Sequence, residues 1–103
     1  MVHISFYVPV SHAEKVKEAM FKAGAGKLGD YEHCSFEVQG TGQFRPLEGS
    51  NPFIGHVSQL EKVEELKVEM ICKKEFLKAS IEALKANHPY ETPAYYVIET
   101  LSL

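Results

Sequence analysis

The chain has 103 residues, 45% hydrophobic and 24% charged, which is the composition of a globular domain rather than a disordered segment. Its net charge is -3, with one arginine and no long basic run, so we expect no nucleic-acid partner. There is no apolar stretch of the roughly 18 residues that a membrane span needs, nor a signal peptide at the N-terminus. We therefore expect no membrane partner, and a cytoplasmic protein with a single domain over residues 1–103.

The first two elements follow from periodicity. Residues 2–8 alternate apolar and polar side chains and predict a strand. Residues 13–23 carry apolar side chains at three- and four-residue steps and predict an amphipathic helix. Ser11 lies three residues before Glu14, which is the spacing of a capping box at the helix start. Gly24 suits the left-handed position that ends the helix.

The middle of the chain predicts two further strands. Residues 33–39 alternate again, which predicts a half-buried second strand, and residues 65–73 predict a third. Between them, glycine and proline recur through residues 40–55, which favours an extended, turning segment over a helix. This segment either forms a separate excursion or continues the second strand beyond a bulge at Gly40–Gly42.

The C-terminal part predicts a helix and a strand. Residues 75–87 show helical periodicity, and Pro89 pushes His88 out of the helical conformation. Residues 94–101 are rich in aromatic and β-branched side chains and predict the last strand. The order β-α-β-β-α-β indicates an α+β, ferredoxin-like fold with a four-stranded antiparallel sheet and two helices on one face.

Such a fold leaves one face of the sheet uncovered. Alternation assigns to that face His3, Ser5, Tyr7, Lys67, Glu69 and Ile71. One face of the last strand joins them, either Tyr95, Val97 and Glu99 or Ala94, Tyr96 and Ile98. This mixed surface predicts a homo-oligomer, a dimer or a trimer, that associates through its sheet. The two cysteines, Cys34 and Cys72, are expected to be free buried thiols that lie near each other.

Three stretches together, GAGKLGDYEHCSF, GTGQFRPLEGSNPFIG and HPYETPAYYV, resemble the insertion domain of the Nif-three-like (YqfO-type) proteins. The resemblance covers nearly the whole chain and implies a PII/CutA-like unit that oligomerises through its sheet. The two-metal site of that family belongs to the flanking halves of the full-length proteins. The resemblance therefore does not imply a hydrolase or cyclohydrolase activity for these residues.

The HPYE segment is the strongest chemical motif. His88 and Glu91 lie three residues apart across a proline turn and form a candidate pair for a divalent metal ion or for proton transfer. The structural alternative is that Pro89 ends a helix, Tyr90 packs and Glu91 binds loop amides. A dyad of Cys34 with a histidine from elsewhere, such as His88, is a further possibility, because His33 and Cys34 point to opposite faces of a strand.

The glycine-rich middle segment is a second candidate. Its GTG sequence matches neither a P-loop nor a dinucleotide fingerprint, so it indicates either a strand bend or a close approach to a ligand. Arg45, the only arginine, is either an anion contact at a subunit boundary or an exposed solubilising residue, and the second role is the more common one.

Our leading interpretation is a non-enzymatic, oligomeric module in a regulatory role that binds a small ligand or metal ion, or another protein, at clefts between subunits. No catalytic residue is assigned. The predicted binding residues are Gly40, Thr41, Gly42, Arg45, His88, Tyr90 and Glu91. The first alternative is a structural domain that docks on a separate partner protein. The second is a small hydrolase-like enzyme that uses His88 and Glu91, with Tyr90 assisting.

Overall fold

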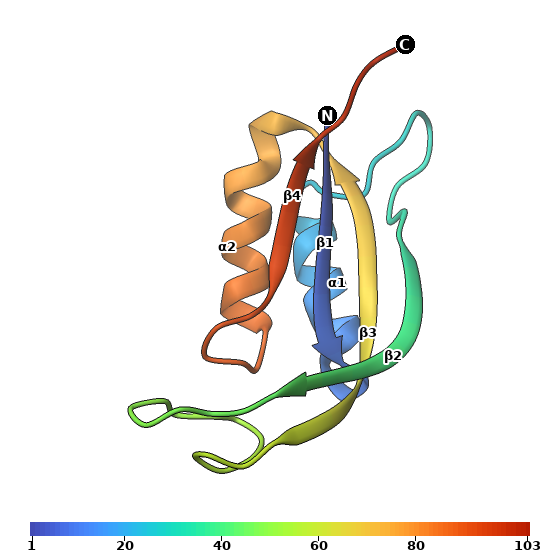
Figure 1. The fold of residues 1–103 in the computed structure, drawn as a ribbon. Helices are drawn as coiled ribbons and strands as arrows, with labels where there is room; N and C mark the ends of the chain where they lie inside the picture. Colours follow the sequence, from blue (N-terminus) through green and yellow to red (C-terminus); the bar gives the residue numbers. More distant parts are fainter.

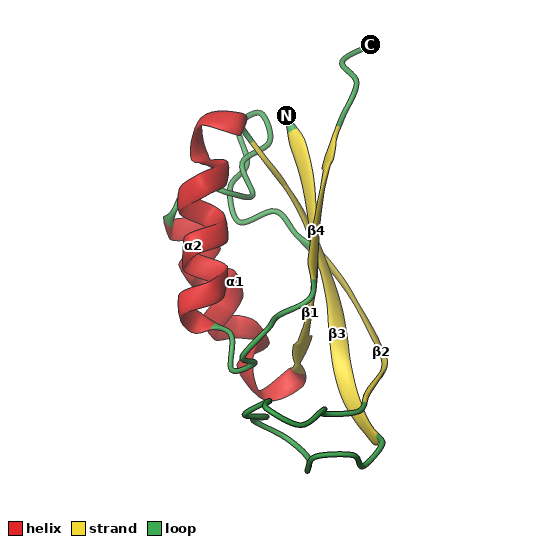
Figure 2. Cartoon of the chain, turned by 60° about the vertical axis from the view of Figure 1, so that its left-hand side comes forward, coloured by secondary structure: helices red, strands yellow, loops and turns green.

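The computed structural model describes residues 1–103 and has four strands and two α-helices (Figure 1). The elements in chain order are β1 (Val2–Pro9), the 3₁₀ turn η1 (Val10–His12), α1 (Ala13–Lys22), β2 (Phe36–Phe44), β3 (Glu61–Cys72), the 3₁₀ turn η2 (Lys74–Phe76), α2 (Leu77–Asn87) and β4 (Tyr95–Glu99). The sheet is antiparallel with strand order β2-β3-β1-β4. Both helices lie on one face of it (Figure 2), which confirms the ferredoxin-like fold.

The core lies between β1, β3 and the two helices. β1 is central in the sheet, and its apolar side chains Ile4, Phe6 and Val8 are fully buried. Helix α1 adds Val16 and Met20 to the same cluster. Burying an apolar side chain of this size stabilises the fold by about 1.5–3 kcal/mol, so these residues hold the helices on the sheet. No helix is long and apolar enough to cross a membrane.

The start of α1 differs from the prediction. Pro9 is followed by the turn η1, so Ser11 lies inside that turn and His12 occupies the N-cap position of α1. The Ser11 hydroxyl contacts His12 Nδ1 at 2.8 Å instead of capping a helix amide. The predicted capping box is therefore wrong, because the chain tightens into a 3₁₀ turn first. The predicted role of Gly24 is confirmed by its φ of +116°.

Strand β2 is longer and more exposed than predicted. It passes through Gly40 and Gly42 with an unbroken antiparallel register against β3, so there is no bulge. Most of its residues are exposed, because β2 is an edge strand and its second half extends past the helices. The second half of β2 and the first half of β3 form a curved arm, residues 40–44 and 61–65 (Figure 1). The prediction of a half-buried strand over residues 33–39 was therefore wrong.

The two cysteines are free and have separate partners. Cys72 is buried, with Sγ 3.6 Å from Ser80 Oγ under α2. Cys34 lies before β2 and is partly exposed, with Sγ 3.8 Å from the Glu32 carbonyl. Free thiols are confirmed, but full burial holds only for Cys72.

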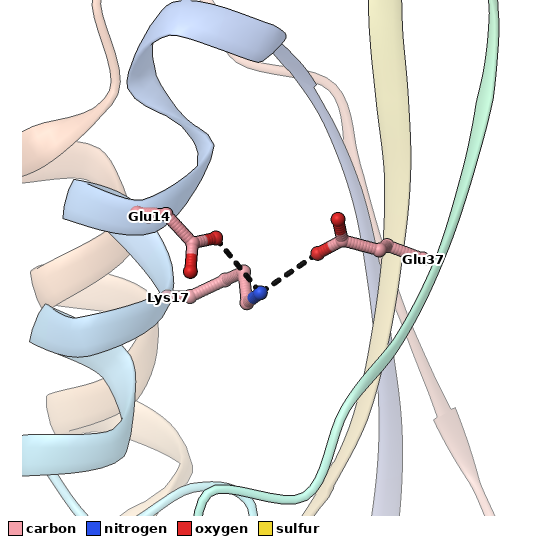
Figure 3. A network of polar contacts seen from close by, with 3 residues as sticks. All are labelled: Glu14, Lys17 and Glu37. Carbon is pink, nitrogen blue, oxygen red and sulfur yellow. Dashed lines mark hydrogen bonds and ion pairs between the residues drawn. The ribbon is translucent and has the colours of Figure 1, made fainter.

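Lys17 ties α1 to the edge strand β2 (Figure 3). Its ammonium donates to Glu14 on the same helix at 2.9 Å and to Glu37 on β2 at 2.7 Å. Partial burial disfavours the charged ammonium, but the hydrogen bonds to Glu37 and Glu14 outweigh it and raise the pKa of Lys17. A raised pKa means that the contribution to stability is complete below pH 10.5 and is lost as the pH rises through the folded-state pKa.

Replacing Lys17 with methionine is expected to lower the free energy of unfolding by about 0.5–1 kcal/mol, because two ion pairs at a partly exposed site are lost while the aliphatic stem remains. Urea denaturation at low and high salt measures this, and the loss should shrink at high salt. Lys15→Met, at an exposed position on the same helix, is the control and should change stability by less than about 0.5 kcal/mol. Equal effects of the two substitutions would contradict the assignment.

Candidate functional site

A cleft of about 450 Å³ lies between the arm and the turn that joins α2 to β4. The loop of residues 45–60, here called the outer loop, follows the end of the arm (Figure 1). Its residues Pro46, Ser50, Pro52, Phe53 and Ile54 line the cleft. The lining residues are Tyr7, Thr41, Gly42, Gln43, Phe44, Pro46, Ser50, Pro52, Phe53, Ile54, Glu65, Tyr90, Glu91, Thr92 and Ala94. Its volume is within the usual range for small-molecule sites.

His88 holds the turn in place from beneath the cleft. Pro89 ends α2, and His88 itself is extended, with φ −77° and ψ 137°, as predicted. The side chain is only 6% exposed. Its Nδ1 accepts a hydrogen bond of 3.0 Å from the backbone N–H of Tyr90. The proton of the neutral ring is therefore on Nε2, which donates to the Tyr7 carbonyl at 2.7 Å.

This position explains the ionisation of His88. Burial lowers its pKa, and the nearby His12 acts in the same direction. The bond to the Tyr7 carbonyl and the charge of Glu65 act in the opposite direction without overcoming burial. A protonated ring would also carry a proton on Nδ1, facing the Tyr90 N–H donor. Neutral His88 is thus the form that the turn requires.

The same bonds bear on the metal and proton-transfer interpretations of HPYE. Both His88 nitrogens are bonded to main-chain groups, so a metal ion would have to displace one of these bonds. Glu91 is bonded elsewhere, because its Oε2 accepts from the backbone N–H of Asn51 at 3.1 Å. No group of three or more His, Cys, Asp or Glu side chains is arranged to share one metal ion. Here His88 supports the turn and Glu91 fastens the outer loop to it.

Tyr90 and Glu65 join the turn to the arm across the cleft. The Tyr90 hydroxyl donates to Glu65 Oε2 at 2.8 Å. Burial raises the pKa of Tyr90, and the hydrogen bond to Glu65 and the charge of Glu65 raise it further. Tyr90 is therefore a phenol donor at any physiological pH. Gly42 leaves room for Glu65, because the Glu65 carboxylate occupies the space that a Cβ at position 42 would need.

Aromatic rings form the apolar wall of the cleft. The Tyr90 ring centroid lies 6.0 Å from that of Phe44 on the arm and 6.5 Å from that of Phe53 in the outer loop. The His12 ring packs edge-on against Phe53 at 5.5 Å, and the His88 ring lies 4.8 Å from Tyr90. These contacts connect the outer loop, the arm and the turn into one aromatic cluster.

Four of the seven predicted binding residues line the cleft, namely Thr41, Gly42, Tyr90 and Glu91. The other three, Gly40, Arg45 and His88, do not line it. His88 nevertheless contacts the lining residue Tyr90. Sequence reasoning missed Tyr7, Phe44, Phe53 and Glu65. Glu65 occurs in a charge-rich stretch, and nothing local distinguishes it from Glu64. Its signal is structural, since only the curved arm brings it opposite Tyr90.

Comparison with known proteins finds relatives that match most of this chain. It is 46% identical over 92 residues to the GTP cyclohydrolase 1 type 2 homologue of Bacillus subtilis and 48% identical over 89 residues to that of Halalkalibacterium halodurans. These matches cover 89% and 86% of the chain but only 25% and 24% of the relatives. The crystal structure of a Bacillus cereus protein related to NIF3 superposes with a TM-score of 0.81 at 42% identity, covering 94% of this chain and 24% of that one. The chain is therefore similar to one segment of the NIF3-related proteins. It spans about a quarter of the length of the relatives that it matches.

The fold of this chain also occurs in small proteins. CutA1 from Pyrococcus horikoshii superposes with a TM-score of 0.71 at 19% identity, covering all of this chain and 86% of that one. The PII-like protein CutA from Nostoc gives 0.69 at 15% identity, covering 97% and 81%. These likenesses show a shared CutA-like fold. No family model matches the chain.

Proposed function

We propose that this NIF3-related segment is a regulatory binding module that takes a small organic molecule in the cleft between the arm and the α2–β4 turn. The observation that carries the proposal is the Tyr90–Glu65 hydrogen bond, which joins two distant segments across an aromatic-walled cleft. A ligand that contacts both sides would stabilise this closed arrangement. A partner protein that contacts the arm or the turn would then respond to whether the cleft is occupied.

The cleft does not suit a nucleoside triphosphate, despite the name of the curated relatives. No Lys, Arg or His lines it, and Arg45 is exposed outside it. Phosphate groups are bound by clustered basic side chains or by backbone N–H groups at a helix N-terminus, and the lining offers neither. A GTP-directed activity is therefore not assigned to these residues.

Nor does the cleft present an arrangement for covalent catalysis. The Ser50 hydroxyl donates to the Leu47 carbonyl, and no histidine lines the cleft to act as its base. Glu91 is bonded to a backbone amide. A nucleophile within hydrogen-bond reach of a base is the minimum for this chemistry. Binding without turnover is the function that this geometry supports.

The uncovered face of the sheet supports self-association. The register places Tyr96 opposite Ser5 and Ile98 opposite His3, so these β4 residues lie on the uncovered face, with Phe36 of β2. All three apolar side chains are more than half exposed. The same face carries the opposite charges of Lys67 and Glu69, with Lys67 Nζ 3.6 Å from Glu69 Oε1. His3 Nε2 lies 3.7 Å from the same oxygen. We define this face by these seven residues and propose that a second copy of the chain covers it.

Native mass spectrometry of protein purified without chelator tests ligand binding and self-association in one experiment. A mass of two or more times 11.6 kDa supports self-association, and extra mass at a fixed ratio per chain supports the binding module. A thermal-shift screen of small amines, alcohols and carboxylates should then find stabilising compounds. Absence of any bound mass and of any stabilising compound would overturn the binding proposal.

The alternative function is a domain that docks on a separate partner protein. The observation that favours it is that the matched segment forms only about a quarter of the NIF3-related relatives, where it accompanies further chain. Affinity purification discriminates the two functions. A single larger protein retained by wild-type chain, but not by a chain with a charged sheet face, would favour docking.

A further inference from the structure

The cleft combines two carboxylates with aromatic walls and has no basic side chain. Its ionisable lining groups are Tyr7, Glu65, Tyr90 and Glu91. Two of these groups are the carboxylates of Glu65 and Glu91, and no Lys, Arg or His lines the cleft to balance them. The cleft is therefore negative as a whole, which excludes anions and favours cations as its guests.

No positively charged side chain of the protein pairs with Glu65 or Glu91. Glu65 accepts one hydrogen bond from the Tyr90 hydroxyl, and Glu91 accepts one from the Asn51 amide. Neither forms an ion pair, although five ion pairs occur elsewhere in the chain. Each carboxylate thus keeps acceptor capacity for a cation with N–H donors.

The Glu65 carboxylate is positioned rather than mobile. The Tyr90 hydroxyl holds Oε2 from one side, and the missing side chain of Gly42 provides the space on the other. In this contact the Tyr90 hydroxyl is the donor and the Glu65 carboxylate is the acceptor. A carboxylate fixed in this way loses little conformational freedom when it binds a cation.

The aromatic walls serve the same class of ligand. Phe44 and Phe53 both lie near Tyr90, with centroids within 6.5 Å of its ring. The faces of such rings attract organic cations, and their area takes up the apolar body that carries the charge. A hydrated metal ion would use none of this apolar surface.

From these features we infer that the ligand of the cleft is a small organic cation, an ammonium group on an apolar body, with Glu65 as its anchor. This inference rests on the proposed binding function and names the ligand class. Glu65 binds the ammonium, Phe44 and Phe53 pack against the body, and Tyr90 acts as the positioning residue for Glu65.

Three probes carry the same phenyl group and differ mainly in charge, so they distinguish recognition of charge from recognition of shape. They are phenethylammonium, the neutral 2-phenylethanol and the anion phenylacetate. Isothermal titration calorimetry at neutral pH should show that phenethylammonium binds at least about tenfold more tightly than the alcohol, and that phenylacetate does not bind. Glu65→Gln should remove that advantage, so that phenethylammonium and the alcohol bind with similar affinity. Glu64→Gln, an exposed neighbour outside the cleft, should leave all affinities unchanged.

Two further variants test the other roles. Phe44→Leu keeps an apolar side chain but removes the ring, so the affinity for phenethylammonium should fall about two- to fivefold, and by more than the affinity for the alcohol. Tyr90→Phe should weaken binding of the ammonium more than binding of the alcohol. This difference should disappear in the Glu65→Gln background, which a merely structural role would not produce.

The outcomes distinguish this inference from the proposed function. Equal affinity for the ammonium and the alcohol, or an ammonium affinity unaffected by Glu65→Gln, would overturn the cation inference but leave a binding module. Failure of all three probes would also overturn it, while hits of other chemistry in the wider thermal-shift screen would preserve the proposed function. Failure of that screen as well would remove both.

Discussion

His88→Ala is expected to lower the free energy of unfolding by about 3 kcal/mol. The substitution leaves the Tyr7 carbonyl and the Tyr90 N–H without their partner, and each unsatisfied buried group costs about 1–3 kcal/mol. It also opens a cavity beneath the Tyr90 ring, which lies 4.8 Å from the imidazole. Urea denaturation followed by circular dichroism measures the loss.

His56→Ala is the matched control, because His56 is exposed in the outer loop. Its effect should stay within about 0.5 kcal/mol of wild type. If His88→Ala changed the free energy of unfolding as little as His56→Ala does, the His88 bonds would not hold the turn. The Tyr90–Glu65 bond depends on that turn, so His88→Ala should weaken ligand binding too, although His88 does not line the cleft.

The same histidine makes stability depend on pH. The folded state lowers the pKa of His88, so the unfolded chain takes up the proton first as the pH falls. Stability from this group is therefore complete above about pH 6.5 and is lost as the pH falls below it, with a slope of at most about 1.4 kcal/mol per pH unit. The difference between wild type and a His88→Ala variant should shrink over that range. A constant difference from pH 7.5 to 5 would disprove the link.

The sequence predicted the fold well because local rules decide it. Alternation in β1 and three- and four-residue spacing in α2 reflect burial against one sheet face, so both elements appear where expected. Pro89 set the conformation of His88 through a steric effect on its immediate neighbour. The β1 and β3 residues of the uncovered sheet face followed from alternation, whereas the residues that β4 and β2 add to it were known only from the register.

The site was harder to predict because its parts are distant in sequence. His88 bonds to Tyr7, which is 81 positions away, and Tyr90 bonds to Glu65, which is 25 positions away. Neither pairing has a local signal. The curvature of the arm, which brings Phe44 against Tyr90, depends on strand twist beyond the helices rather than on any motif. The GTG segment was recognised as important, but Gly42 makes room for a side chain of its own protein.

Ile98→Glu is expected to convert the assembly to single chains of 11.6 kDa. Ile98 lies on the edge strand β4, more than half exposed on the uncovered sheet face and opposite His3. In a self-associated form, every copy would bury a new carboxylate against apolar neighbours, which costs several kcal/mol and exceeds what most interfaces can lose. Because the site is exposed in the single chain, the fold itself should keep its stability within about 0.5 kcal/mol.

Sedimentation velocity over a range of concentrations measures the change, and denaturation checks the fold. Ala86→Glu places the same carboxylate on an exposed position of α2, in the helix layer on the other side of the sheet, and should leave the assembly intact. If Ile98→Glu sediments like wild type, a second copy does not cover this face. If both variants dissociate, the interface includes the helices, and the apolar residues of the sheet need another partner. Dissociation by Ile98→Glu alone would assign the interface to the sheet face, because only there does one added charge meet Phe36, Tyr96 and their counterparts in the second copy.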